Sequence, residues 1–117
     1  MNFVENIIEK FKNYKLLEDD KVIVDLNITK VDNNWKGSVF YIPTVYKNIY
    51  NKEKYNHIKN NILNSDVYIP PHIEFVDNLV KFVEGRYSFS VIRDIGCISM
   101  PFIVYLEDLE IVSELFV

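Results

Sequence analysis

An α+β fold is predicted by three features of the 117-residue sequence. Apolar side chains recur at helical spacing near the N-terminus and again over residues 71–84. Residues 22–29 alternate between apolar and polar side chains, as a strand with one buried face does. The expected strands follow one another in pairs, which favours antiparallel pairing of chain neighbours. We therefore expect an antiparallel sheet of about four strands packed against three or four helices, in the order α-β-β-α-(β)-α-β-β-α.

The first part of the chain is expected to hold a helix followed by a hairpin. The helix covers residues 3–16, where an apolar stripe is flanked by acidic residues at the start and basic residues at the end. The hairpin joins a strand over 22–29 to a second strand over 35–42. Its turn is the Asp-Asn-Asn run at 32–34, because Asn and Asp tolerate left-handed backbone.

Two further helices are expected in the middle of the chain. Residues 44–64 predict a helix with a lysine-rich polar face, and residues 67–69 a short strand after it. A Pro-Pro pair then opens the helix expected over 71–84, since proline suits the first helical turn. We expect Val80 on the buried stripe of this helix and Gly85 as its left-handed C-terminal cap.

A second strand pair and a tail complete the expected fold. The strands cover 86–94 and 98–106, and Pro101 has no N–H to donate, so its strand is expected at a sheet edge or with a bulge. The apolar residues of the tail from 107 to 117 fit both helical and strand spacing. Helix is the interpretation that we favour there.

The composition indicates one globular domain that spans residues 1–117. Hydrophobic residues make up 49% and charged residues 26%, which is too apolar for intrinsic disorder and too interrupted for a membrane span. Cys97 is the sole cysteine, and the first residues lack the features of a secretory signal, so we expect a cytoplasmic protein. The lack of Ala and Gln, with abundant Asn, Ile, Lys and Tyr, indicates a gene of low-GC origin.

Acidic side chains gather at the C-terminal end of the chain. Residues 1–93 hold 13 Lys and Arg against 12 Asp and Glu, a sum of +1, whereas residues 94–117 hold five acidic residues and no base, a sum of −5. Such an excess attracts partners of the opposite charge and repels nucleic acid. A solvated polar face is the plainer alternative. We interpret four of these carboxylates and a neighbouring aromatic side chain as a partner-binding surface: Tyr105, Glu107, Asp108, Glu110 and Glu114.

Motifs for metal, cofactor or nucleotide binding do not stand out. The two histidines, His57 and His72, have no second ligand at zinc-binding spacing. Three glycines are too few for a dinucleotide fingerprint or a phosphate-binding loop. The run from Asp32 matches the start of a calcium loop, but Pro43 stands where the bidentate Glu belongs. We therefore expect no metal and no cofactor.

Three other kinds of function stay open. A small enzyme without a familiar motif would need Cys97, His57 or His72 at its active site, although a lone cysteine among apolar neighbours is usually a buried hydrophobe. The basic, tyrosine-rich stretch 46–59 has the composition to stack on single-stranded nucleic acid, but the acidic chain as a whole disfavours that partner. The apolar C-terminus would suit a homodimer.

Protein binding is the function that the sequence favours. A small acidic domain without a catalytic constellation is typical of proteins that neutralise a toxin or nuclease by covering its basic active site. In this profile the chain resembles bacterial immunity proteins, and also phage-encoded inhibitors of host defence enzymes. The expected partner is therefore a basic protein, and no membrane is involved.

Overall fold

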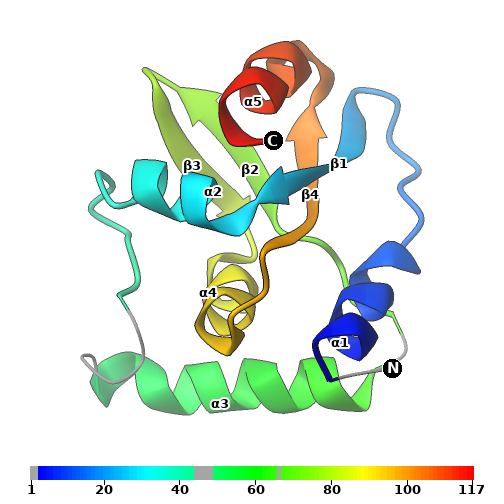
Figure 1. Cartoon of the computed structure of the whole chain (residues 1–117), viewed down its shortest axis with the longest axis vertical. Helices are drawn as coiled ribbons and strands as arrows, with labels where there is room; N and C mark the ends of the chain where they lie inside the picture. The colour runs from blue at the N-terminus through cyan, green and yellow to red at the C-terminus, as the bar shows by residue number, and fades with distance from the viewer. Residues whose placement is uncertain (1–2, 44–48, 66) are drawn as a thin grey trace.

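The computed structural model describes residues 3–43, 49–65 and 67–117, and it confirms an α+β fold (Figure 1). Four strands form one sheet in the order β1-β4-β2-β3. The strands are β1 (Lys21–Asn27), β2 (His72–Val76), β3 (Leu79–Glu84) and β4 (Ser99–Tyr105). The helices in the described part of the chain are α1 (Phe3–Lys12), α2 (Ile28–Trp35), α3 (Ile49–Asn64), α4 (Arg86–Ile95) and α5 (Leu109–Phe116), with the 3-10 turn η2 (Leu106–Asp108) before α5.

The sheet is mixed. Antiparallel pairing was expected throughout, and this expectation is wrong for the pair β2 and β4. β1 runs antiparallel to β4, and β2 runs antiparallel to β3. The two pairs join in parallel, with His72 opposite Ile103 and Ile73 opposite Val104. β1 therefore takes its partner from the far end of the chain rather than from its neighbour in sequence.

Residues 72–84 form the β2–β3 hairpin, so the helix predicted over 71–84 is wrong. Asp77 and Asn78 have φ values of 54° and 65°, and two successive left-handed residues make a tight hairpin turn. The β-branched and aromatic side chains around them favour strands. Val80 is fully buried as expected, but Val83 is 44% exposed because strand alternation turns it to the opposite side from a neighbour such as Val80 or Phe82.

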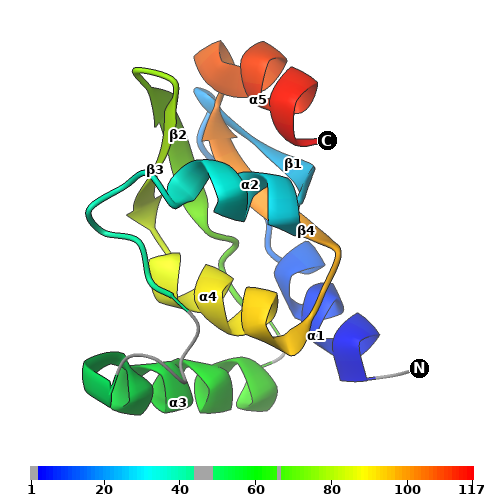
Figure 2. The same ribbon diagram turned by 60° about the vertical axis from the view of Figure 1, so that its left-hand side comes forward.

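Residues 86–95 form α4, so the strand predicted over 86–94 is wrong as well. Gly85 adopts the left-handed backbone that was expected, at φ 88°, but it connects β3 to the start of α4. Gly96, at φ 100°, ends the same helix. Helix α4 lies between the sheet and α3 (Figure 2), and five consecutive residues of it are buried. Tyr87, Phe89 and Val91 alternate with serines, so the sequence there has the period of a strand although the segment is helical.

The return strand predicted over 35–42 is wrong as well, because α2 follows β1 directly. Asn27 ends β1 and caps α2, because its Oδ1 accepts a hydrogen bond from Lys30 N at 2.9 Å. Val31 and Trp35 are then one helical turn apart, and both are buried. The turn predicted at 32–34 is thus part of a helix, and an irregular segment follows it to residue 43.

Several other predictions are confirmed. The helices expected over 3–16 and 44–64 are present in shorter form as α1 and α3, although residues 44–48 lie outside the described residues. Helix is confirmed for the tail, as η2 and α5. The short strand expected over 67–69 is wrong, because these residues have no regular structure. Among the described residues, no helix has the length and apolar character to cross a bilayer.

β4 is a central strand although it contains Pro101, so the predicted edge position is wrong. Ile103 N donates a hydrogen bond to Pro71 O at 2.8 Å, which directs Ile103 N toward β2. Backbone direction alternates along a strand, so the Pro101 nitrogen lies on the same side. β2 pairs with β4 only at residues 103 and 104, so the missing N–H removes no ladder bond.

An aromatic cluster holds α2 and α4 against the sheet. The Trp35 ring centroid lies 4.6 Å from that of Phe82 in β3 and 5.7 Å from that of Phe89 in α4. Phe89 in turn lies 5.7 Å from Phe102 in β4. Trp35 forms edge-to-face pairs with Phe82 and Phe89, and pairs of that kind add about 0.5–1.5 kcal/mol each beyond their buried area. Helix α5 contacts α2 and β1, so this core also determines where α5 lies.

Candidate functional site

The predicted partner-binding residues lie where β4 leaves the sheet and continues into α5 (Figure 1). Tyr105 is the last residue of β4, Glu107 and Asp108 belong to η2, and Glu110 and Glu114 belong to α5. Glu110 and Glu114 are one helical turn apart, so they project from the same side of α5. Both are exposed, as is Glu107. The structure thus brings three of the four predicted carboxylates to one exposed stretch.

Asp108 and Tyr105 are engaged within the fold instead. Asp108 Oδ2 accepts a hydrogen bond from Phe75 N at 3.2 Å. β2 pairs with β4 only at His72 and Ile73, so the N–H of Phe75 has no acceptor on β4. The Asp108 carboxylate supplies that acceptor. Tyr105 packs edge-on against His72, with ring centroids 4.7 Å apart. Both residues therefore contact β2 and hold the end of the sheet together.

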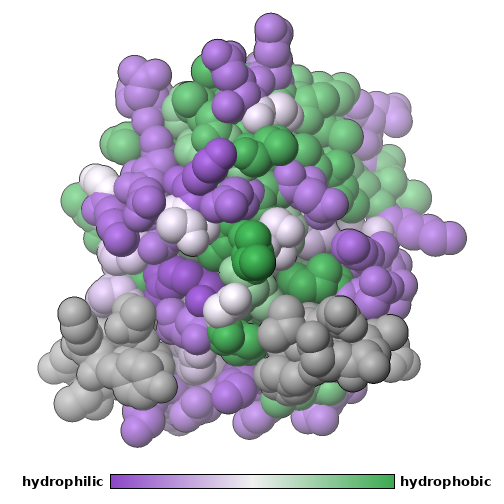
Figure 3. Space-filling model, in the orientation of Figure 1, coloured by the Kyte–Doolittle hydropathy of each residue, from purple (hydrophilic) through white to green (hydrophobic). Residues whose placement is uncertain are grey.

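Aliphatic side chains lie beside the exposed carboxylates. Ile111 and Leu115 are 36% and 43% exposed, and each directly follows Glu110 or Glu114 in the chain. Along one helix these four residues form two adjacent rows, one acidic and one aliphatic. Figure 3 shows hydrophobic and hydrophilic surface interleaved at the top of the molecule, where α5 lies. We call the following set the α5 face: Glu107, Glu110, Ile111, Glu114 and Leu115.

The loop before β1 adds acidic residues that sequence reasoning missed. Leu106 N donates a hydrogen bond to Asp20 O at 2.9 Å, which holds this loop against the start of η2. Asp19 and Asp20 are exposed, whereas Glu18 pairs with Lys21 at 3.7 Å. Three consecutive acidic residues are a visible signal in the sequence. Their position beside η2 depends on the distant β1–β4 pairing, which the sequence does not reveal.

The negative charge of Glu114 is electrostatically unfavourable at its position in α5. The last turn of a helix carries the negative end of its dipole, and α5 has no basic residue there. Glu110 adds like-charge repulsion one turn earlier. Each effect destabilises the helix by about 0.2–1 kcal/mol. Surface charge that opposes local stability is expected where a residue serves binding.

His72 lies behind Tyr105 and is only 6% exposed. Burial lowers the pKa of His72, and the positive charge of Lys21 lowers it further, against the opposing effect of nearby carboxylates. Its Nε2 atom has no hydrogen-bond partner within the described ranges. His72 is therefore a buried ring that packs against Tyr105 from inside the fold.

The residues of the alternative enzyme hypothesis do not come together. His57 is exposed on α3, where its Nε2 lies 3.3 Å from Asn61 Nδ2. Cys97 follows α4 and is buried, and burial raises the pKa of its thiol. Among the residues that the structure describes, no hydrogen bond links any two of Cys97, His57 and His72, and no three metal-ligating side chains cluster.

In the tyrosine-rich stretch 46–59, Tyr55 is the tyrosine whose side chain the structure describes. Tyr46 and Lys47 lie outside the described residues. Tyr55 is 8% exposed and belongs to the hydrophobic core. A ring packed in the core cannot stack on a base.

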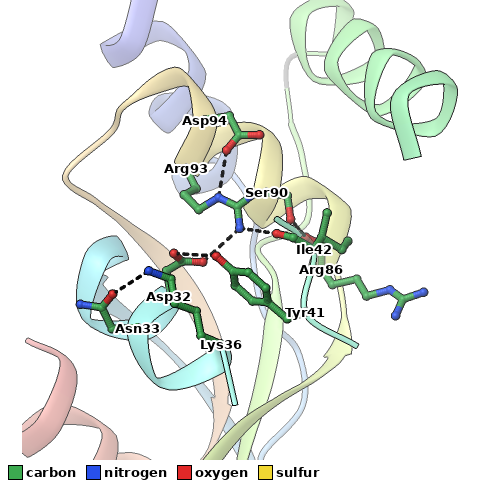
Figure 4. Close-up of polar contacts among 9 residues, drawn as sticks. All are labelled: Asp32, Asn33, Lys36, Tyr41, Ile42, Arg86, Ser90, Arg93 and Asp94. Atoms are coloured by element: carbon green, nitrogen blue, oxygen red, sulfur yellow. Dashed lines mark hydrogen bonds and ion pairs between the residues drawn. The ribbon is translucent and has the colours of Figure 1, made fainter. Parts of the chain in front are cut away.

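A buried ion-pair network joins α4, α2 and the segment after α2 (Figure 4). Arg93 Nη1 donates to Asp32 Oδ1 at 3.0 Å and to Ile42 O at 2.6 Å, and Arg93 Nε donates to Asp94 Oδ1 at 2.9 Å. Tyr41 donates its hydroxyl proton to Asp32 Oδ2 at 3.1 Å. Burial alone would lower the pKa of Arg93, but the hydrogen bonds and charges of Asp94 and Asp32 raise it overall. The Asp94 side chain is 7% exposed and pairs with Arg93, so Asp94 lies inside the fold and not on the acidic surface.

Comparison of the chain with protein-family models, with curated proteins and with solved structures finds no significant match. A function therefore has to follow from the surface chemistry of the chain itself.

Proposed function

We propose that this chain is a protein-binding inhibitor that covers the basic active site of a toxin or nuclease-like target with its α5 face. The observation that carries this proposal is the combination, on one side of one helix, of exposed carboxylates at Glu110 and Glu114 with exposed aliphatics at Ile111 and Leu115. Apolar contacts of this kind supply buried area, and the adjacent charges select a partner of opposite sign.

The inhibitory mechanism is occlusion. The carboxylates of the α5 face would occupy the positions where a basic active site normally holds the phosphates of its substrate. Helix α5 is suited to this role because its inner side packs against the rest of the fold. Val112 is fully buried, and the Phe116 ring centroid lies 5.8 Å from that of Phe75. A surface that is already ordered loses little conformational entropy when it binds.

The test compares two variants with the same change in net charge. Glu110→Lys with Glu114→Lys reverses the charge of the α5 face. Glu9→Lys with Glu53→Lys makes the same change at exposed positions on α1 and α3. Each protein is used to capture partners from an extract of the source cells, and the association rate with the captured protein is then measured at low and high salt.

We expect the wild-type protein and the α1/α3 variant to bind a basic protein and to inhibit its activity, while the α5 variant binds it at least tenfold more weakly. The association rate should fall as salt rises, because screening shortens the reach of the charges to about 8 Å at physiological ionic strength. Equal binding by all three proteins would remove the α5 face as the contact. Self-association that is lost on changing Leu115→Asp would instead assign this face to a homodimer.

A further inference from the structure

We propose that the free edge of β3 binds an extended, carboxylate-bearing segment of a partner protein as an added strand. This site is separate from the α5 face, and it does not depend on the proposed inhibitory function. β3 is an outer strand, because the sheet order β1-β4-β2-β3 leaves it paired with β2 alone. Figure 1 shows the segment after α2 descending outside β3 toward α3.

The β3 edge is closed at its first position and open further along. Asn34 of α2 imitates a neighbouring strand: its Oδ1 accepts a hydrogen bond from Val80 N at 2.7 Å, and its Nδ2 donates to Asn78 O at 3.1 Å. Val80 N therefore faces away from β2, and by the alternation of an antiparallel ladder so do the N–H and C=O of Phe82. Unpaired backbone groups on a sheet edge are a template for another strand.

A groove of about 1180 Å³ runs along this edge. It is bounded by β3, by the segment after α2, by the segment before β2 and by the facing sides of α3 and α4. Its most exposed apolar side chains come from three different parts of the chain. These are Val39 (93% exposed), Phe40 (66%), Val67 (50%), Ile69 (53%) and Val83 (44%).

Isolated exposed apolar side chains are common on protein surfaces, but five of them around one groove mark a binding surface. A strand added to β3 would direct alternate side chains to opposite sides of the sheet. One set would meet the apolar walls of the groove. The geometry therefore favours an extended peptide with alternating apolar residues over a helix or a compact ligand.

The groove carries a pair of cations near the end of β3. Lys54 Nζ lies 4.3 Å from the Tyr87 ring centroid, and Arg86 Cζ lies 5.2 Å from the same ring and 5.6 Å from that of Phe40. Within the described ranges, neither cation forms an ion pair with a carboxylate. Glu84 also lines the groove but pairs with neither.

This charge arrangement selects the partner. A segment that carries an acidic side chain at this end would satisfy both cations while its apolar residues fill the groove. Two cations also offset the desolvation of the incoming carboxylate. Lys81, the remaining base of the groove, lies opposite the acidic residue Glu74 in the β2–β3 register.

The experiment selects peptides of about eight residues, a length within the usual range for strands, from a random display library on the immobilised full chain. Enriched peptides are synthesised and their Kd values are measured for the wild type and three variants. Phe40→Asp places a charge in the apolar wall, and Arg86→Glu reverses one cation. Ile98→Asp is the matched control, because Ile98 is 78% exposed but does not line the groove.

We expect enriched peptides to combine alternating apolar residues with an acidic residue. Phe40→Asp and Arg86→Glu should each raise Kd at least tenfold, whereas Ile98→Asp leaves it unchanged. Backbone N-methylation of the peptide at alternate residues should abolish binding in one register and spare it in the other, because only alternate N–H groups face β3.

Three results would overturn the proposal: no enrichment of any peptide, equal Kd values for the wild type and Phe40→Asp, or binding that tolerates N-methylation at every position. The proposal would also be contradicted if the free chain formed a dimer that dissociates on changing Phe40→Asp. The β3 edge would then bind a second copy of this chain. The Glu110→Lys, Glu114→Lys variant should bind these peptides as the wild type does, so failure of the α5 proposal and failure of this one are separate outcomes.

Discussion

Arg93 Nη1 lies 3.0 Å from Asp32 Oδ1, and the two side chains are only 9% and 12% exposed. This ion pair ties the last turn of α4 to the middle of α2. Tyr41 and the carbonyl of Ile42 join the same network, so it also holds the segment that forms the outer wall of the β3 groove.

Removing one partner of this pair should destabilise the protein strongly. Arg93→Met leaves Asp32 and Asp94 buried without their counter-charge, and breaking a buried pair in this way typically costs about 3–5 kcal/mol. The free energy of unfolding is measured by urea denaturation. Glu18→Gln is the control, because it breaks the more exposed pair with Lys21 at 3.7 Å and should change stability by less than about 1 kcal/mol. Similar small changes for both variants would show that the network contributes little.

Stability should decrease as the pH falls through the titration range of His72. The pKa of His72 is lowered in the folded protein, by burial first and by Lys21 second, while Glu84, Glu74 and Asp20 act in the opposite direction. The unfolded chain, with a pKa near the ordinary 6.5, then binds more protons below that pH, which favours unfolding. The stabilising contribution is complete above the unfolded pKa and is lost as the pH falls from about 6.5 toward the folded pKa.

The measurement for His72 is the free energy of unfolding by urea at about pH 7.5 and about pH 5.5, which lie on either side of the ordinary histidine pKa. His72→Phe keeps a ring against Tyr105 and should reduce the loss of stability between the two pH values. His57→Gln, at an exposed position, should leave that loss unchanged. An identical pH dependence for wild type and His72→Phe would contradict the prediction.

Two glycines with similar backbone conformations should respond differently to alanine. Gly85 and Gly96 have φ values of 88° and 100°, so alanine is strained at both, at about 1–3 kcal/mol. At Gly85 an added Cβ would lie 2.8 Å from Pro71 Cα, whereas at Gly96 it would meet nothing within 4 Å. Gly85→Ala should therefore lower the melting temperature clearly more than Gly96→Ala. Equal losses would mean that the contact with Pro71 relaxes freely.

Substitutions of the two acidic residues of η2 should differ in their effect on stability, because Asp108 has a structural contact and Glu107 is exposed. Asp108→Ala leaves the Phe75 N–H without its acceptor and should cost about 1–3 kcal/mol of stability. Glu107→Ala changes an exposed side chain and should stay within about 0.5 kcal/mol. Thermal denaturation of the two variants gives the comparison. A stable Asp108→Ala protein would return Asp108 to the group of free surface carboxylates.

The sequence predicted the fold class because alternation in β1 and helical periodicity in α1 are local signals. The prediction was wrong over 71–84 because the apolar residues there fit both the helical period and the strand period. The positive φ of Asp77 and Asn78 decides for the hairpin, and an Asp-Asn pair between β-branched runs was the available sign. It failed at 86–94 because Tyr87, Phe89 and Val91 alternate with serines at the period of a strand.

The candidate site was predicted in part for a related reason. Exposure of Glu110 and Glu114 follows from the pitch of α5 once helix is assumed. The role of Asp108 could not be predicted, since it depends on the point where β4 stops pairing with β2. The β3 groove could not be predicted either, because its walls come from segments that only the long-range strand pairing brings together.

The central position of β4 has a consequence for how the sheet assembles during synthesis. β1 and the β2–β3 hairpin emerge from the ribosome first, yet neither pairs with the other; each waits for residues 99–105 to complete the sheet. Until then β1 and the β2 edge that later meets β4 stay unpaired and apolar side chains stay uncovered, and chains in such a state aggregate readily. A chain that stops before residue 99 would therefore lack the strand that joins its two halves, and late pairing of distant segments makes folding slow as well.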